Sequence, residues 1–214
     1  TWRDPYSWRV RVGEAGSVNY MRYSVKAVVD AYDGTSTLYI FDQADPIIRA
    51  FSTIFPALFR PASEMPASLR LHTRYPEIYF RAQAEIYRTF HMTDPEAFYN
   101  REDLWDLATN IYGQSTDPEL LPPTYIVGNI PGSSKPEFLL LQPFTPRNKA
   151  NLIGVMMARC DGENLGEVVV LQLSAQSLIY GPLQVEARIG SDQEIAKDLS
   201  LWNQQGSQVI RGHM

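Results

Sequence analysis

The sequence predicts an α+β protein, with antiparallel β-hairpins at both ends of the chain and a helical segment between them. β-Branched stretches flank a turn signal within residues 20–41. Helical apolar periodicity, with repeated proline starts, occupies about 63–112. Strand patterns return after Pro122-Pro123. Because strands and helices are grouped along the chain and do not alternate, the order is typical of α+β proteins.

The first hairpin is predicted from two strands and the turn between them. Residues 23–31 and 37–41 have strand composition, and Asp33-Gly34 lies between them. This dipeptide favours a type I′ turn, which needs positive φ at both central residues. A short strand is also expected at 8–12.

Aspartate followed by proline marks helix starts in the segment that follows. Asp45 is predicted as an N-cap with Pro46 at the first helical position, and the pair at 94–95 repeats the pattern. Residues 76–90 carry the most regular apolar stripe and predict the longest helix. A variant capping box at 100–103 predicts a further helical start.

Strands are expected again in the second half of the chain. Residues 124–130 and 136–144 are predicted strands joined by a polar turn. Residues 152–159 and 167–173 are predicted as a hairpin around a glycine-containing loop. The Met and Ala residues of 152–159 also suit a helix, which is the alternative there.

Helices are expected near the end of the chain, with starts at Pro182 or Asp192, before residues 207–212 return to strand. The predicted organisation is an N-terminal segment of uncertain role, 1–19, and a single α+β domain, 20–214. Two packed lobes that meet near residue 122 are the alternative division.

Composition indicates a folded globular chain. The 214 residues are 44% hydrophobic and 20% charged, which is enough for a substantial core. The net charge of −5 argues against a nucleic-acid partner. A single cysteine, Cys160, excludes an intrachain disulfide and a cysteine-based zinc cluster. No apolar stretch approaches the ~18–20 residues that span a bilayer.

The sequence carries no recognisable catalytic motif. A G-x-S-x-G elbow, an H-E-x-x-H pair and a phosphate loop are all missing from it, and His72, His91 and His213 are scattered. Carboxylates distant in sequence can still converge for glycoside hydrolysis, because their separation is a property of the fold. The sequence therefore identifies no cofactor and leans against an enzyme.

One loop is a candidate anion site. Arg147, Asn148 and Lys149 follow a predicted strand, and arginine offers bidentate geometry to phosphate or carboxylate. A purely structural corner, with Asn148 capping a helical turn, is the alternative.

A second loop is a candidate calcium site. Asp161, Glu163 and Glu167 lie among glycines, and Ca²⁺ binds oxygen ligands. The spacing departs from the EF-hand pattern, so a solvated hairpin loop is the alternative. Acidic neighbours raise a thiol pKa, so we expect Cys160 to be buried or inert.

Several long blocks occur here in one order and together resemble the soluble region of uncharacterised protein family 0182, large bacterial integral membrane proteins of unknown function. The resemblance extends over 20–212. It departs from the family pattern at Cys160, where we expect Ser. The blocks are "SVKAVVDAYDG", "DPIIRAF", "HMTDPEAFYNREDLW", "PFTPRNKANLI", "ARCDGENLGE", "YGPLQVEARI" and "LWNQQGSQVIRG".

The resemblance implies a cellular location and no reaction. Members have N-terminal transmembrane helices followed by a large extracytoplasmic region, so we expect this chain to be part of that region, at the cell membrane on the periplasmic or extracellular side. Its expected partners are the rest of its own membrane-embedded chain and an envelope protein. A binding or assembly module is the predicted function. An envelope hydrolase acting on glycans or lipids and a ligand-presenting domain of a transporter are the alternatives.

Overall fold

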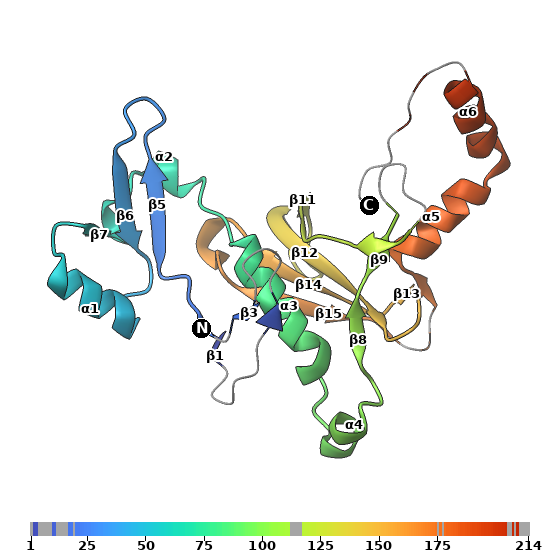
Figure 1. Cartoon of the computed structure of the whole chain (residues 1–214), viewed down its shortest axis with the longest axis horizontal. Coiled ribbons are helices and arrows are strands. Elements are labelled where there is room, and N and C mark those ends of the chain that lie inside the picture. The colour runs from blue at the N-terminus through green and yellow to red at the C-terminus, as the bar shows by residue number, and fades with distance from the viewer. Residues whose placement is uncertain are drawn as a thin grey trace.

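The structure is a computed structural model that describes residues 2–3, 10–11, 17–18, 20–111, 117–174, 176, 178–204, 207 and 209. Figure 1 shows a small hairpin lobe at one end, a central sheet crossed by a long helix, and two consecutive helices at the other end. The helices are α1 (Pro46–Ile54), α2 (Ala67–Arg70), α3 (Glu77–Phe90), α4 (Pro95–Asn100), α5 (Pro182–Ser191) and α6 (Gln193–Gln204).

Most of the strands are short. Those of the first half are β1 (Trp2–Arg3), β2 (Val10–Arg11), β3 (Ser17–Val18), β4 (Tyr20–Met21), β5 (Val25–Val29), β6 (Ser36–Ile40), β7 (Phe59–Pro61), β8 (Trp105–Leu107) and β9 (Thr109–Asn110). Those of the second half are β10 (Glu119–Leu120), β11 (Thr124–Gly128), β12 (Glu137–Pro146), β13 (Asn151–Leu152), β14 (Gly154–Arg159), β15 (Val168–Gln172) and β16 (Ile179–Tyr180).

The central sheet is antiparallel and is organised around β12. Its order is β11-β12-β14-β15, and β8 pairs with the last residues of β12. Leu140 is the Cα partner of Tyr125 on one side and of Ala158 on the other. The strands predicted at 124–130 and 136–144 are confirmed, and 152–159 is strand and not helix.

Helix α3 covers one face of this sheet, which confirms the helix predicted at 76–90. Phe80 and Ala84 of α3 pack with Leu140 and Phe144 of β12, all with 0% exposure. Trp105 of β8 closes this core and is 1% exposed. This burial explains the apolar stripe of α3, because one face of the helix packs against the sheet and the opposite face is more exposed.

Close packing against Trp105 requires a glycine in β14. A Cβ atom built on Gly154 would lie 3.0 Å from the indole ring of Trp105 and 3.1 Å from the carbonyl oxygen of Leu171. Both distances are shorter than ordinary van der Waals contact, so any larger residue would push the indole ring away from the sheet.

The hairpin lobe comprises β5, β6, β7, α1 and α2. Strands β5 and β6 are antiparallel, β7 is parallel to β6, and α1 lies in the connection between β6 and β7. Asp45 caps α1 by accepting a hydrogen bond from the Ile47 N–H at 2.9 Å, as predicted. Asp94 caps α4 in the same way through the Ala97 N–H.

The predicted type I′ turn is wrong. Of the residues between β5 and β6, Gly34 has a φ of 77°, while Asp33 has no positive φ. The connection is longer than two residues, and the Gly34 N–H donates to the Asp30 carbonyl at 2.9 Å. Asp33 instead accepts from the Thr35 N–H, so the aspartate stabilises a wider loop through its side chain.

The helical segment is shorter than predicted. Helix α4 ends at Asn100, and Arg101 takes the left-handed conformation with a φ of 55°, so no helix begins at 100–103. Trp105–Leu107 is strand β8 because its backbone pairs with β12. The capping signal at 100–103 predicted a helix, but pairing of β8 with β12 determines the structure here. Tertiary contacts often override local propensity. Residue 112, the predicted end of the segment, is outside the described residues.

The end of the chain also differs from the prediction of a terminal hairpin. The hairpin of β14 and β15 is followed by α5 and α6, whose predicted starts at Pro182 and Asp192 are confirmed. The strand predicted at 207–212 falls mostly outside the described residues. Across the described ranges, no helix combines the length and apolar character that crossing a membrane requires.

Candidate functional site

A cleft of about 530 Å³ opens between β5, the connection from α2 to α3, and β11. We call it the Lys26 cleft. It brings together segments that lie far apart in the sequence, and its walls are aromatic and apolar, with the cationic side chains of Lys26 and Arg74. Its lining includes Tyr23, Lys26, Met65, His72, Arg74 and Tyr125.

Strand β5 places Lys26 toward the body of the protein. Side chains alternate along a strand, and Lys26 is half-buried while Ala27 is exposed. The ammonium Nζ donates to the Arg74 carbonyl at 3.2 Å and lies 3.9 Å from the centroid of the Tyr23 ring. It is also 5.0 Å from the Phe41 ring centroid. Two ring faces therefore flank the ammonium, which is a cation–π arrangement.

The electrostatic setting of Lys26 is unusual for a lysine. Within the described residues its ammonium has no ion-pair partner, and burial lowers its pKa to about 8. At neutral pH the ammonium is mostly charged and its charge is not neutralised by a carboxylate. A group of this kind attracts an anion and, near pH 8, also has a substantial population of neutral amine.

Arg74 holds the connection between α2 and α3 in place. Its Nη1 donates to the carbonyl oxygens of Leu71 and Thr73, both at 2.9 Å. Its guanidinium lies 4.7 Å from the centroid of the Phe138 ring. The Arg74 carbonyl accepts from the Tyr23 hydroxyl at 2.6 Å as well as from Lys26, so one peptide group fixes both residues.

The far wall of the cleft is a tyrosine from β11. Tyr125 stacks on Phe138 with ring centroids 5.3 Å apart and planes 3° from parallel. Its hydroxyl donates to the Tyr75 carbonyl at 2.9 Å. Burial raises the pKa of Tyr125 and of Tyr75, so both hydroxyls remain neutral donors at physiological pH.

The cations in the Lys26 cleft are not matched by acids. Lys26 and Arg74 line it, and its described lining residues include neither Asp nor Glu. A second pocket of about 430 Å³ beside α1 is lined by Arg49 and Arg60, again without a carboxylate among its described residues. Neither place holds a carboxylate pair for acid–base hydrolysis, and both suit negatively charged groups.

The anion site predicted at Arg147, Asn148 and Lys149 lies elsewhere, in the turn that follows β12. All three side chains are exposed, and Asn148 has a φ of 61°. The Arg147 N–H donates to the Leu104 carbonyl at 2.9 Å, and the Lys149 N–H to the Pro146 carbonyl at 3.0 Å. The backbone geometry is that of a tight corner, and the structure does not bring these residues to the Lys26 cleft.

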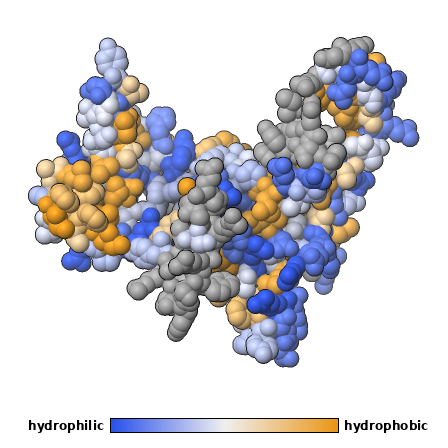
Figure 2. All heavy atoms as spheres, viewed as in Figure 1, coloured by the Kyte–Doolittle hydropathy of each residue, from blue (hydrophilic) through white to orange (hydrophobic). Residues whose placement is uncertain are grey.

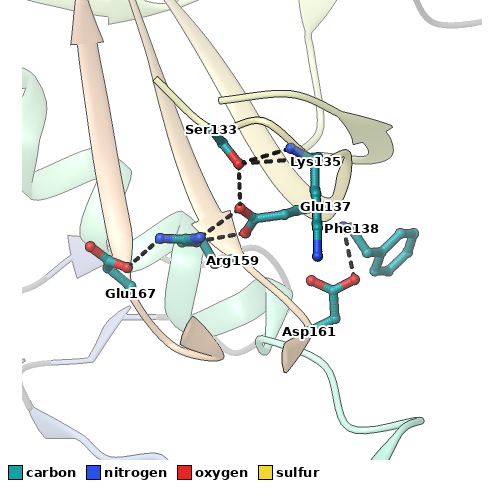
Figure 3. Close-up of polar contacts among 7 residues, drawn as sticks. All are labelled: Ser133, Lys135, Glu137, Phe138, Arg159, Asp161 and Glu167. Carbon is teal, nitrogen blue, oxygen red and sulfur yellow. Dashed lines mark hydrogen bonds and ion pairs between the residues drawn. The ribbon is translucent and has the colours of Figure 1, made fainter. Parts of the chain in front are cut away.

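Of the residues predicted to bind calcium, Asp161, Glu163 and Glu167, only Glu167 contacts Arg159 in the polar network that Figure 3 shows. Arg159 binds both carboxylate oxygens of Glu137, at 2.5 and 2.6 Å, and one oxygen of Glu167 at 2.7 Å. Asp161 accepts from the Phe138 N–H at 3.0 Å, and Glu163 is exposed. Across the described ranges, no three His, Cys, Asp or Glu residues converge to hold a metal ion.

Cys160 is buried, as predicted. It is 0% exposed and lies in the core beneath α3, and burial raises its pKa. Lys26 and Arg74, by contrast, were not among the residues predicted to bind a ligand. The available signal was a lysine inside a β-branched strand, three residues after a tyrosine, where an exposed position is the usual expectation.

Fold and cleft together define a mixed α+β module with an open cleft lined by Lys26 and Arg74. The chain belongs to the uncharacterised protein family UPF0182, whose family model matches residues 2–202. The resemblance seen in the sequence is thereby confirmed.

The similar proteins share the family name and are much longer than this chain. A UPF0182 protein of Solibacter usitatus is 62% identical over 210 residues, which cover 98% of this chain and 23% of that protein. One from Methanospirillum hungatei is 50% identical over 213 residues, covering 99% of this chain and 24% of that protein. The chain thus spans less than a quarter of the length of these relatives. No solved structure matches it.

Proposed function

We propose that this chain is a binding or assembly module in the extracytoplasmic part of a membrane protein, and that α1 docks against another part of its own longer polypeptide. The observation that carries the proposal is the exposed apolar surface of α1. We call this surface the α1 face and define it by Ile47, Phe51, Ile54, Phe55 and Leu58.

The α1 face is apolar and solvent-exposed. Its side chains are between 46% and 65% exposed, and α1 contains no buried residue. Phe51 and Phe55 stack on one another with ring centroids 6.5 Å apart. Figure 2 shows hydrophobic residues gathered over α1 at the left of the molecule. Contiguous apolar surface of this kind is typical of an interaction site.

Covering the α1 face would contribute substantially to binding. Fully burying a large apolar side chain is worth about 1.5–3 kcal/mol, so completing the burial of a half-exposed one is worth roughly 1 kcal/mol. A longer polypeptide could supply the segment that covers the α1 face, because the relatives contain more than three times as much chain outside the matched region as within it. An occupant from the same polypeptide also avoids much of the entropic cost of association.

Photo-crosslinking in the intact natural protein tests this proposal. Benzoylphenylalanine placed at position 51 should crosslink to residues of the same polypeptide outside this chain, identified by mass spectrometry. The same probe at Tyr99, which is 86% exposed on α4, is the matched control and should not give that product. Crosslinks to lipid, to a second copy or to a different protein would contradict an occupant from the same chain.

The hydrolase alternative receives no support from the two clefts. It requires ionisable groups that converge with opposed environments, whereas the Lys26 cleft gathers cations without a carboxylate among its described lining residues. The α1 face, in contrast, is the kind of apolar patch that an assembly module requires. Binding is therefore the function that the geometry supports best.

A further inference from the structure

We infer that the Lys26 cleft binds a small ligand in which an anionic group, a phosphate or carboxylate, is joined to an apolar or planar body. This site goes beyond the proposed assembly function, because its lining shares no residue with the α1 face. Three features of the cleft carry the inference: its unpaired cations, its aromatic walls and its fixed geometry.

Hydrogen-bond donors of Lys26 and Arg74 that have no partner among the described residues indicate that the ligand carries an anionic group. A lysine ammonium has three N–H donors, and among the described residues Lys26 directs one to the Arg74 carbonyl. Arg74 directs Nη1 to two carbonyl oxygens and has no carboxylate partner within the described ranges. Because charge-assisted hydrogen bonds are about twice as strong as neutral ones, an entering phosphate or carboxylate gains most at this point.

The aromatic and apolar walls of the cleft indicate that the rest of the ligand is apolar or planar. Tyr23 and Tyr125 contribute ring surfaces and Met65 an apolar surface. The volume of about 530 Å³ lies within the range of small-molecule sites, roughly 300–1,000 Å³. An inorganic anion would leave most of this apolar lining exposed to water, so a ligand with an attached ring or short aliphatic body fits better.

The geometry is fixed before any ligand arrives. The Arg74 carbonyl accepts from both Tyr23 and Lys26, and Tyr125 is locked by its stack on Phe138 and its bond to Tyr75. Side chains that are already ordered lose little entropy on binding. A purely structural lysine would be satisfied by the same ring contacts, so the test has to separate support of the fold from ligand binding.

The first experiment measures protection of Lys26 in the intact natural protein, held in phosphatidylcholine nanodiscs. Acetylation by an N-hydroxysuccinimide ester at pH 8 is followed at Lys26, with the exposed Lys149 as internal reference. Phenyl phosphate should slow acetylation of Lys26 at least about 5-fold and leave Lys149 unchanged, and benzoate should act in the same direction. Benzyl alcohol, which has the ring without the anion, should give little protection.

Phosphatidylglycerol nanodiscs separate two sources of the same chemistry. If phenyl phosphate in solution protects Lys26 from acetylation, the ligand is a soluble molecule. If phosphatidylglycerol alone protects Lys26, the ligand is a lipid head group. Either result supports the anion site. Failure of phenyl phosphate, benzoate and phosphatidylglycerol to protect Lys26 overturns it, whatever the crosslinks at α1 show.

Variants complete the test by titration calorimetry with phenyl phosphate. Lys26→Met should weaken binding roughly 10- to 100-fold, and Lys26→Arg should restore part of it. Lys149→Met is the matched control, because it removes a lysine from the corner at residues 147–149, and it should bind as the natural protein does. Loss of binding in Lys149→Met with Lys26→Met unaffected would overturn the assignment. The protection measurement needs no substitution, so it decides the question even if Lys26→Met does not fold.

Discussion

Lys26 and Cys160 show how burial acts on single side chains in this protein. Desolvation disfavours the charged form of each, so it lowers the lysine pKa to about 8 and raises the pKa of the thiol. The outcomes differ because of access. Lys26 borders an open cleft and can meet a ligand, whereas Cys160 is 0% exposed and cannot. The acidic loop next to Cys160 in sequence is the lesser cause, since burial dominates the thiol pKa.

The Arg159 network supports a prediction at the same scale. Hydrogen bonding to Arg159 lowers the pKa of Glu137 below its ordinary value. Replacing Arg159 by Met should lower the midpoint of urea denaturation at pH 7, because Glu137 and Glu167 lose their common partner. The control is Arg147→Met, which removes an exposed arginine without an ion pair among the described residues and should leave the midpoint nearly unchanged.

The pH dependence of this effect has a definite sign. A carboxyl whose folded-state pKa is lowered stabilises the protein above its unfolded pKa, about 4.3 for glutamate, and the contribution disappears as the pH falls through the folded-state value. The difference in denaturation midpoint between Arg159→Met and the natural chain should therefore be largest at pH 7 and should shrink below about pH 4. A difference that stays constant down to pH 3 would show that Arg159 acts through packing and not through its charge.

At the scale of the element, two helices that begin with the same Asp-Pro signal differ in what the aspartate contacts. Asp45 is 2% exposed, accepts from the Ser24 hydroxyl at 2.5 Å and pairs with Arg22 at 2.9 Å. Burial alone would raise the pKa of Asp45, but the bonds from Ser24, Arg22 and the Ile47 N–H outweigh it and lower the value. Asp94 is exposed and its side chain bonds the Ala97 N–H.

This contrast predicts unequal costs for one substitution. Asp45→Ala should destabilise the chain by about 2–4 kcal/mol, since it removes a helix cap and leaves buried partners unsatisfied. Asp94→Ala should cost about 1 kcal/mol, which is typical of an exposed cap. Urea denaturation of the 214-residue chain measures both. Equal losses in the two variants would mean that the buried contacts of Asp45 contribute nothing beyond capping.

At the scale of the whole molecule, the two candidate interaction surfaces occupy the same end. Both belong to the hairpin lobe or to its junction with the central sheet, while α3 and the sheet supply the packed core (Figure 1). The tip of the same hairpin carries Tyr32, which is 101% exposed and offers a probe of location.

The proposed extracytoplasmic location can be measured through that tip. In whole cells that express the intact natural protein with Tyr32→Cys, a membrane-impermeant maleimide should label position 32. Cys160 should stay unlabelled, because its side chain is fully buried. The protein without the substitution is the control for other thiols. Labelling of position 32 only after the cells are permeabilised would place the domain on the cytoplasmic side and refute the proposed location.

Local chemistry explains how much of the fold was predictable. Asp45 and Asp94 accept hydrogen bonds from N–H groups two or three residues away. The starts of α1 and α4 could therefore be predicted from neighbouring residues in the sequence. Strands β11, β12, β14 and β15 of the central sheet were predicted from signals that are also local, the alternation of side chains and the flanking turns. The prediction failed at β8 because its partner is remote: β8 is a strand because β12 lies beside it, whereas its own sequence favoured a helix start.

The sequence by itself determined the α+β class, the main helices and strands, and membership of the UPF0182 family, since these depend on residue order over short windows or long matching blocks. Only the tertiary structure decided that Lys26 lines a cleft and that the α1 face stays uncovered within the described residues. The physical reason is distance along the chain. The hydrogen bonds that build the cleft join residues 48 to 51 positions apart, and no local pattern of side chains encodes which of them will meet.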